Sequence, residues 1–362
     1  MKRVSRMPLL QQLLLLAAAG LASAEPQVPC YFVFGDSLVD NGNNNDIPSM
    51  ARANYPPYGI DFPGGATGRF SNGLTTVDAI SRLLGFNDYI PPYATATDEK
   101  LLTGVNFASA AAGIRDETGQ QLGERISFSE QLQNYQAAVQ RLVSTLGDEG
   151  TAANRLSQCI FTVGMGSNDY LNNYFMPAFY STSRQYTPEQ YADVLINQFS
   201  QQLRTLYNYG ARKVAVMGVG PVGCSPNELA QHSRNGATCI ERINSAVRMF
   251  NRRLVLLINQ FNDLPGAQFT YINIYGIFES ILRAPRANGM AVTNTGCCGV
   301  GRNNGQVTCL PFQTPCANRD EYAFWDAFHP TEAANILVGE RAYSAATLFD
   351  VQPVDLRTLA QL

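Results

Sequence analysis

A strand and a turn meet in the stretch Tyr31-Phe32-Val33-Phe34-Gly35-Asp36-Ser37-Leu38-Val39-Asp40-Asn41-Gly42-Asn43-Asn44-Asn45. Its first four residues are aromatic or β-branched, which predicts a short buried strand. Gly35 and Asp36 end the strand, and the Asn- and Gly-rich part must turn. Ser37 therefore lies at the carboxyl end of a buried strand, where open α/β sheets place their active sites. A lone Ser in a turn is also a common structural feature, so its role depends on the rest of the chain.

Strand and helix patterns alternate along the remaining sequence. We expect further strands at residues 104–109, 159–164, 213–217 and 268–274. We expect helices at residues 75–84, 127–146, 187–209, 240–261 and 277–282, and from about residue 331. This alternation implies right-handed crossovers and a parallel sheet that is covered on both faces. The prediction is one three-layer α/β/α domain with a mainly parallel five-stranded sheet in the flavodoxin-like strand order 2-1-3-4-5.

The first 24 residues have the pattern of a signal peptide. Lys2, Arg3 and Arg6 precede an apolar stretch, and Ala22-Ser23-Ala24 is a small-residue cleavage site. The apolar stretch is too short to span a bilayer, and we find no later candidate for a transmembrane segment. We therefore expect residues 25–362 to form a secreted protein with a single domain.

The charge and the cysteines limit the classes of partner and of compartment. A net charge of −3 without a Lys/Arg run argues against nucleic acid as a partner. Eight cysteines favour disulfides in an oxidising compartment. Cys30 and Cys159 either pair or simply pack together, and Cys224 pairs with Cys239. Cys309 and Cys316 are the expected partners of the adjacent Cys297 and Cys298, in an order that the sequence leaves open.

Motifs for cofactors and metals are weak or missing. Residues 218–223 match a dinucleotide fingerprint on paper, but Cys224, Ser225 and Pro226 follow where a helix should begin, so we expect a structural loop. The sequence contains no phosphate-binding Gly-x-x-x-x-Gly-Lys-Ser/Thr and no Gly-x-Ser-x-Gly elbow. It also lacks a Cys-x-x-Cys pair. We expect neither a cofactor nor a metal.

A nucleophilic Ser needs a base, and the chain has only two histidines. His232 lies in a polar stretch between two cysteines, where a surface position is expected. His329 follows Asp326 by three residues in a turn. The Asp326 carboxylate can hold one imidazole nitrogen and leave the other free to take the proton of Ser37. The alternative is that Asp326 and His329 merely cap the next helix.

Acyl transfer also needs donors for a developing oxyanion. Gly166-Ser167-Asn168-Asp169 follows the strand at 159–164 and offers the Asn168 amide. The small-residue stretch 110–113 follows the strand at 104–109, and Gly113 can present a bare backbone N–H. Three neighbouring strands would then each be followed by a residue that takes part in catalysis.

Taken in order, these motifs resemble those of the SGNH (GDSL) hydrolases, in particular the secreted plant GDSL esterase/lipase branch. The ordered set is Gly35-Asp36-Ser37-Leu38, a Gly after the second strand, Gly166-x-Asn168-Asp169 and Asp326-x-x-His329. The resemblance implies Ser37 as nucleophile, His329 as base and Asp326 as its orienting partner. It also implies an oxyanion hole formed by the Ser37 N–H, the Gly113 N–H and the Asn168 side chain. Ala108-Ser109-Ala110-Ala111-Ala112-Gly113 departs from the family pattern by carrying Ala where Gly is common.

The function expected on this basis is secreted hydrolysis of carboxylic esters, such as lipid or small-molecule esters, without a cofactor. Transfer of the acyl group to a lipid or sugar hydroxyl is an alternative within the same chemistry. A non-catalytic extracellular binding protein on an esterase scaffold is an alternative from another class. The sequence leaves the natural substrate and the oligomeric state open.

Overall fold

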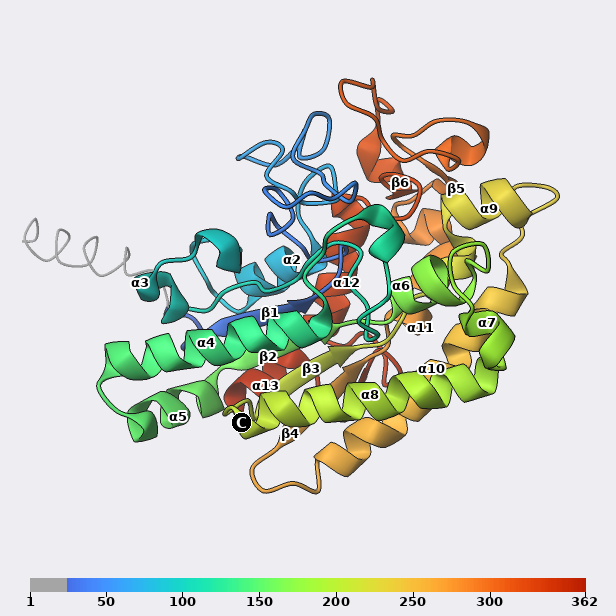
Figure 1. The fold of residues 1–362 in the computed structure, drawn as a ribbon. Coiled ribbons are helices and arrows are strands. Elements are labelled where there is room, and N and C mark those ends of the chain that lie inside the picture. Colours follow the sequence, from blue (N-terminus) through green and yellow to red (C-terminus); the bar gives the residue numbers. More distant parts are fainter. Residues whose placement is uncertain (1–24) are drawn as a thin grey trace, which may run out of the picture.

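The computed structural model describes residues 25–362, and the predicted signal peptide (residues 1–24) lies outside them (Figure 1). Its main sheet has the order β1-β2-β3-β4-β7, with the first four strands parallel and the last antiparallel. The strands are β1 (Tyr31–Gly35), β2 (Ile160–Gly164), β3 (Lys213–Met217), β4 (Gln268–Ile272) and β7 (Val351–Gln352). A small separate sheet pairs β5 (Val292–Gly296) with β6 (Tyr322–Phe324).

The segment expected as the second strand lies along the outer edge of β1. Val33 donates its N–H to the Val105 carbonyl over 3.1 Å, and Phe107 donates to the Val33 carbonyl over 2.7 Å. The segment is not a regular strand, because its other edge bonds to loops and side chains. Asn43 Nδ2, for example, donates to the carbonyls of Asn106 and Ala108. Counting this segment, the order is the predicted 2-1-3-4-5, and only the antiparallel β7 was not expected.

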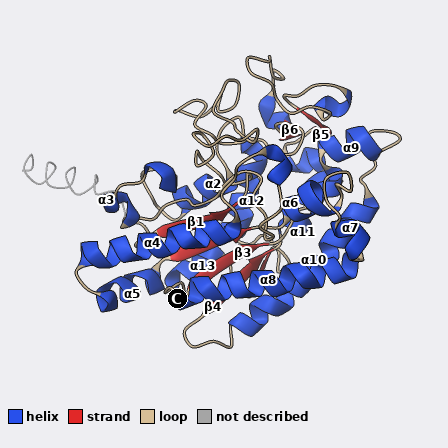
Figure 2. Cartoon of the chain, viewed as in Figure 1, coloured by secondary structure: helices blue, strands red, loops and turns tan. Residues whose placement is uncertain are grey.

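Helices cover both faces of the sheet, which confirms the predicted fold class (Figures 1 and 2). The apolar core on one face includes residues of α4 (Phe128–Leu146), α5 (Glu149–Gln158), α8 (Pro188–Asn208) and α10 (Glu241–Phe261). The core on the other face includes residues of α2 (Thr76–Leu83), α11 (Ile274–Arg283), α12 (Glu332–Tyr343) and α13 (Leu356–Gln361). Shorter helices are α3 (Asp98–Leu101), α6 (Ser167–Asp169), α7 (Thr182–Gln185) and α9 (Pro226–His232). No helix within residues 25–362 is long and apolar enough to cross a membrane.

Local sequence signals explain several helix starts. Ser127 with Glu130 and Thr187 with Gln190 form the expected capping boxes of α4 and α8, in which each side chain bonds the other residue's backbone N–H. The glycine-rich residues 218–221 form a loop, as expected, and a short 3-10 turn follows at Val222–Cys224. The helix α9 begins directly after it, because Ser225 accepts the Glu228 N–H as its N-cap and Pro226 occupies the first turn.

Long loops gather beyond the carboxyl ends of the strands (Figure 2). A third buried cluster holds these loops together and contains Tyr58, Phe70, Trp325 and three cysteines. Disulfides join Cys30 to Cys159, Cys224 to Cys239, Cys297 to Cys316 and Cys298 to Cys309. Cys224–Cys239 is the expected pair, and Cys30 and Cys159 pair rather than simply pack together. The structure also gives the order that the sequence left open for the last two.

Candidate active site

The structure brings Ser37 and His329 together from opposite ends of the described chain. Ser37 lies in the turn that follows β1, and His329 lies in the turn between β6 and α12. The Ser37 Oγ is 2.8 Å from the His329 Nε2. His329 is 7% exposed, and the centre of its ring lies 4.8 Å from that of Phe70. The proposed nucleophile and base are therefore in direct hydrogen-bond contact.

Asp326 closes the same turn from the other side of the imidazole. Both of its carboxylate oxygens are 2.8 Å from the His329 Nδ1. The Asp326 Oδ1 also accepts the backbone N–H groups of Phe328 and His329, each over 2.8 Å. Asp side chains often organise turns by accepting such N–H groups. The spacing of three residues places the carboxylate against the imidazole because this local turn fixes both.

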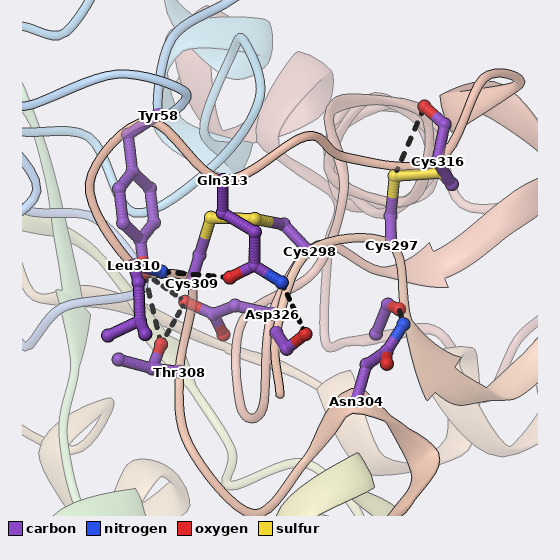
Figure 3. Close-up of a disulfide and its surroundings, with 12 residues drawn as sticks. Tyr58, Cys297, Cys298, Asn304, Thr308, Cys309, Leu310, Gln313, Cys316 and Asp326 are labelled. Carbon is purple, nitrogen blue, oxygen red and sulfur yellow. Dashed lines mark hydrogen bonds between the residues drawn. A yellow bond between two sulfur atoms is a disulfide. The ribbon is translucent and has the colours of Figure 1, made fainter. Parts of the chain in front are cut away.

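Two hydroxyl groups from distant loops also hold Asp326 (Figure 3). Tyr58 donates its O–H to Asp326 Oδ2 over 2.6 Å, and Thr308 donates to the same oxygen over 3.0 Å. Thr308 directly precedes Cys309, which is joined to Cys298. The carboxylate is completely buried, so each of its hydrogen bonds must come from the protein.

The environment keeps Asp326 ionised although it is buried. Burial by itself raises the pKa of the carboxyl, but the His329 imidazole and the hydrogen bonds from His329 and Tyr58 hold this pKa below its usual value. The neighbouring Asp36 differs. Burial raises the pKa of Asp36 to about 6, although the Leu38 N–H and the nearby His329 favour its charged form.

Asn168 lies at the carboxyl end of β2, in the short helix α6. Its Nδ2 donates to the Ala112 carbonyl over 2.9 Å, and its Oδ1 accepts a bond from Asn172 over 2.6 Å. These two contacts fix the plane of the amide. An amide nitrogen carries two hydrogens, so one of them remains available beyond the bond to Ala112.

The loop after residues 104–109 presents a different residue from the one expected. Gly113 does not line the pocket that contains Ser37 and His329, whereas Ala111 does. A Cβ on Gly113 would lie 2.5 Å from Thr118 and 2.8 Å from Asp169 Oδ1, so close packing explains this glycine. Ala111 has φ of 66°, a conformation that costs a non-glycine residue about 1 kcal/mol. Within the described residues, neither the Ser37 nor the Ala111 backbone N–H donates to another protein group.

The pocket around these residues is lined by loops from the N-terminal and C-terminal parts of the chain. Its lining brings together Ser37, Ala111, Asn168 and His329. Arg52, Tyr58, Asn172 and Thr308 lie in the same lining and make part of it polar. By contrast, His232 is exposed at the end of α9 and does not line this pocket, as expected for a surface residue.

Comparisons with known proteins show the family of this chain. Residues 31–342 match the family model described as GDSL-like lipase/acylhydrolase. The chain belongs to this family. GDSL esterase/lipase At1g29660 from Arabidopsis thaliana is 63% identical over 96% of both chains. GDSL esterase/lipase At5g45670 from the same plant is 60% identical over 99% of this chain and all of that one.

Among solved structures, phospholipase A1 from Streptomyces albidoflavus NA297 matches 85% of this chain and 94% of its own at 13% identity. The TM-score of 0.34 is too low for this likeness to carry an argument. The family model and the topology described above support the assignment instead.

Three residues of this GDSL site were missed by sequence reasoning. Tyr58 and Thr308 carry no motif of their own, and their contact with Asp326 spans 268 and 18 residues. Ala111 carries no such motif either, because a glycine is the usual residue for an exposed backbone N–H. The signal that could have found it is the departure from the family pattern in Ala108–Gly113, since an Ala in place of a Gly keeps the backbone N–H.

Proposed function

We propose that this protein is a secreted serine esterase/lipase that hydrolyses carboxylic ester bonds through Ser37, His329 and Asp326. The observation that carries the proposal is the 2.8 Å contact between Ser37 Oγ and His329 Nε2, with Asp326 on the opposite imidazole nitrogen. This is the relation that a Ser hydroxyl needs for activation near neutral pH, because the imidazole takes its proton during attack. Family membership supports the same chemistry.

In the acylation step, Ser37 Oγ attacks the ester carbonyl carbon while its proton moves to His329 Nε2. The carbonyl oxygen becomes an oxyanion, and collapse of this intermediate breaks the ester C–O bond. His329 returns the proton to the departing alcohol oxygen, and the acyl group remains on Ser37. Asp326 stabilises the imidazolium that forms between these events and does not itself become protonated.

The oxyanion requires donors already in position. The proposal assigns this role to the backbone N–H groups of Ser37 and Ala111 and to the free hydrogen of Asn168 Nδ2. Ala111 replaces the expected Gly113, because Ala111 lines the pocket and its N–H has no partner within the described residues.

Deacylation reverses the roles of the groups. Water attacks the acyl carbon, gives its proton to His329, and the acid leaves as Ser37 recovers its proton. An alcohol in place of water would give acyl transfer, the first alternative function. Adding a primary alcohol and analysing the products separates these outcomes, because transfer yields a new ester and hydrolysis yields only acid.

The proposal also includes secretion and a single catalytic domain over residues 25–362. The signal-peptide pattern and the four disulfides support an oxidising compartment. Detection of the protein in the medium of expressing cells, with cleavage near residue 24, tests this part separately from the chemistry.

The decisive experiment is Ser37→Ala, measured by turnover of p-nitrophenyl butyrate and by labelling with a fluorophosphonate. We expect kcat to fall at least about 10³-fold and labelling to disappear. Ser144→Ala, at an exposed position of α4, is the matched control and should behave as wild type. Full activity of Ser37→Ala would reject the mechanism, and a wild-type protein that neither turns over esters nor takes the label would favour a binding function.

A further inference from the structure

A second cavity adjoins the pocket of Ser37 and is lined by the carboxyl ends of β2 and β3 and by the helices α11 and α12. The cavity is partly open to solvent. The two cavities share five residues in their linings: Leu38, Ser167, Leu171, Val222 and Phe328. Leu38 directly follows Ser37, and Ser167 directly precedes Asn168. The shared wall therefore lies beside the nucleophile and a proposed oxyanion donor.

The surface of this second cavity is apolar, and no charged residue lines it. Its few polar side chains are largely used within the protein. Thr76 donates its hydroxyl to Asn335 Oδ1, and the amide of Asn335 donates to the Leu74 carbonyl. Ser225 accepts the Glu228 N–H at the start of α9. Because these groups already have partners, the cavity favours hydrocarbon over a polar ligand.

The two adjoining cavities differ in charge. The pocket of Ser37 combines apolar side chains such as Phe70 with polar and charged groups such as Arg52, whereas the second cavity has no charged residue in its lining. An ester held at Ser37 has two arms, the acyl chain and the alcohol. The arm that fits the apolar side is a hydrocarbon chain, and the more polar alcohol suits the opposite side.

We propose that the cavity between Gly220 and Ile274 binds the acyl chain, so that the substrates are esters of apolar, medium or longer acyl chains. This assignment rests on the proposed function, because it places the ester carbonyl at Ser37. Gly220 and Ile274 then act as specificity-determining residues. A Cβ on Gly220 would lie 3.5 Å from Ile274 Cγ2, an ordinary contact, and any larger side chain there would extend into the cavity.

The test compares kcat/KM for p-nitrophenyl octanoate and acetate. Each buried methylene favours binding about three- to fourfold, so we expect the wild-type ratio of octanoate to acetate to be at least about tenfold. Gly220→Leu fills the cavity from the β3 side, and Ile274→Phe fills it from α11. Each should lower the ratio at least about tenfold. Ala137→Leu adds the same side chain as the first variant on an exposed position of α4 and should keep the wild-type ratio.

The outcomes are distinct for the two proposals. A wild-type protein that cleaves both esters but prefers acetate, or filled variants that fold and keep the wild-type ratio, would overturn the acyl-chain assignment while leaving the serine-esterase function intact. A protein that cleaves neither ester and resists fluorophosphonate would overturn both. A crystal structure of the wild-type adduct with an octyl fluorophosphonate adds a measurement independent of the variants. The octyl chain between Gly220 and Ile274 supports the assignment, and a chain directed toward Arg52 rejects it.

Discussion

The hydroxyl of Tyr58 donates a 2.6 Å hydrogen bond to Asp326 Oδ2, although the two residues are 268 positions apart. The bond is completely buried, and burial together with the Asp326 charge raises the pKa of Tyr58. Tyr58 therefore remains a neutral donor over the working pH range. It bonds the same Asp326 Oδ2 that lies 2.8 Å from His329 Nδ1, so it acts through Asp326 and is a positioning residue rather than a catalytic one.

Tyr58→Phe tests this relationship. Loss of a hydrogen bond to a buried charge corresponds to about 1.5–3 kcal/mol, so we expect kcat/KM to fall about ten- to hundredfold. An Asp326 with fewer donors attracts the imidazolium more strongly, which should move the acidic limb of the pH profile of kcat/KM to higher pH. The readout is the full pH profile with p-nitrophenyl butyrate.

Tyr55→Phe is a matched control for Tyr58→Phe. Tyr55 packs edge-on against Tyr58, but its hydroxyl donates to the Cys309 carbonyl and not to Asp326. Its acidic limb should coincide with that of wild type. If Tyr58→Phe kept the wild-type pH profile of kcat/KM, the Tyr58–Asp326 hydrogen bond would have no role in catalysis.

Asn168→Ala should lower kcat by about 10² to 10³ with a smaller change in KM, because an oxyanion donor acts mainly in the transition state. Asn172→Ala removes the bond that orients Asn168 Oδ1, together with the bond that Asn172 Oδ1 accepts from Gln121 Nε2, and should give a smaller loss. Steady-state kinetics of both variants, with the exposed Asn87→Ala as control, provide the comparison. Equal losses in all three variants would argue for a general loss of folding instead.

The Cys298–Cys309 disulfide should matter more for activity than Cys30–Cys159, because Thr308 links the former to Asp326. The double variant Cys298→Ala/Cys309→Ala should therefore lower kcat. Cys30→Ala/Cys159→Ala releases a longer loop and should cost more stability, about 5 against about 3 kcal/mol in the chain-entropy account. Activity at 20 °C and chemical denaturation of both proteins separate the two effects. If loss of Cys30–Cys159 lowered kcat more than loss of Cys298–Cys309, the link between Cys298–Cys309 and the active site would be rejected.

Stability should decrease between pH 5 and pH 8. The pKa of buried Asp36 is raised to about 6, so its favourable contribution is fully present below the pKa of the unfolded chain, near 4. That contribution is lost as the pH rises through about 6. Burial raises the pKa of Asp40 to about 6 and that of Asp169 to about 7, with the same sign. Asp326, whose pKa is lowered, instead loses its contribution only in more acidic solution.

Asp36→Asn isolates one of these groups, because Asn retains an oxygen that can accept the Leu38 N–H. The difference in Tm between pH 5 and pH 8 should become smaller by about 2–5 °C. Asp46→Asn makes the same charge change at an exposed position and should preserve the wild-type difference. Thermal melts of the three proteins in matched buffers test this prediction, and an unchanged difference in Asp36→Asn would contradict it.

The sequence by itself determined the features that depend on neighbouring residues. The apolar runs at 31–34 and 213–217 became parallel strands, and the capping residues Ser127 and Thr187 became helix starts, because these signals act within a few residues. The ordered motifs also identified Ser37, Asn168, Asp326 and His329, which the fold brings into one pocket or against it.

Only the tertiary structure decided what distant residues do to one another. The pairing of Cys297 and Cys298, the support of Asp326 by Tyr58 and Thr308, and the presence of Ala111 rather than Gly113 in the pocket lining all depend on how loops far apart in sequence pack above the sheet. The apolar cavity beside Ser37 has the same origin, since β2, β3, α11 and α12 each contribute one wall. Local propensity specifies an element, but a cavity or a buried hydrogen bond exists only where separate elements meet, and that meeting is set by packing of the whole core.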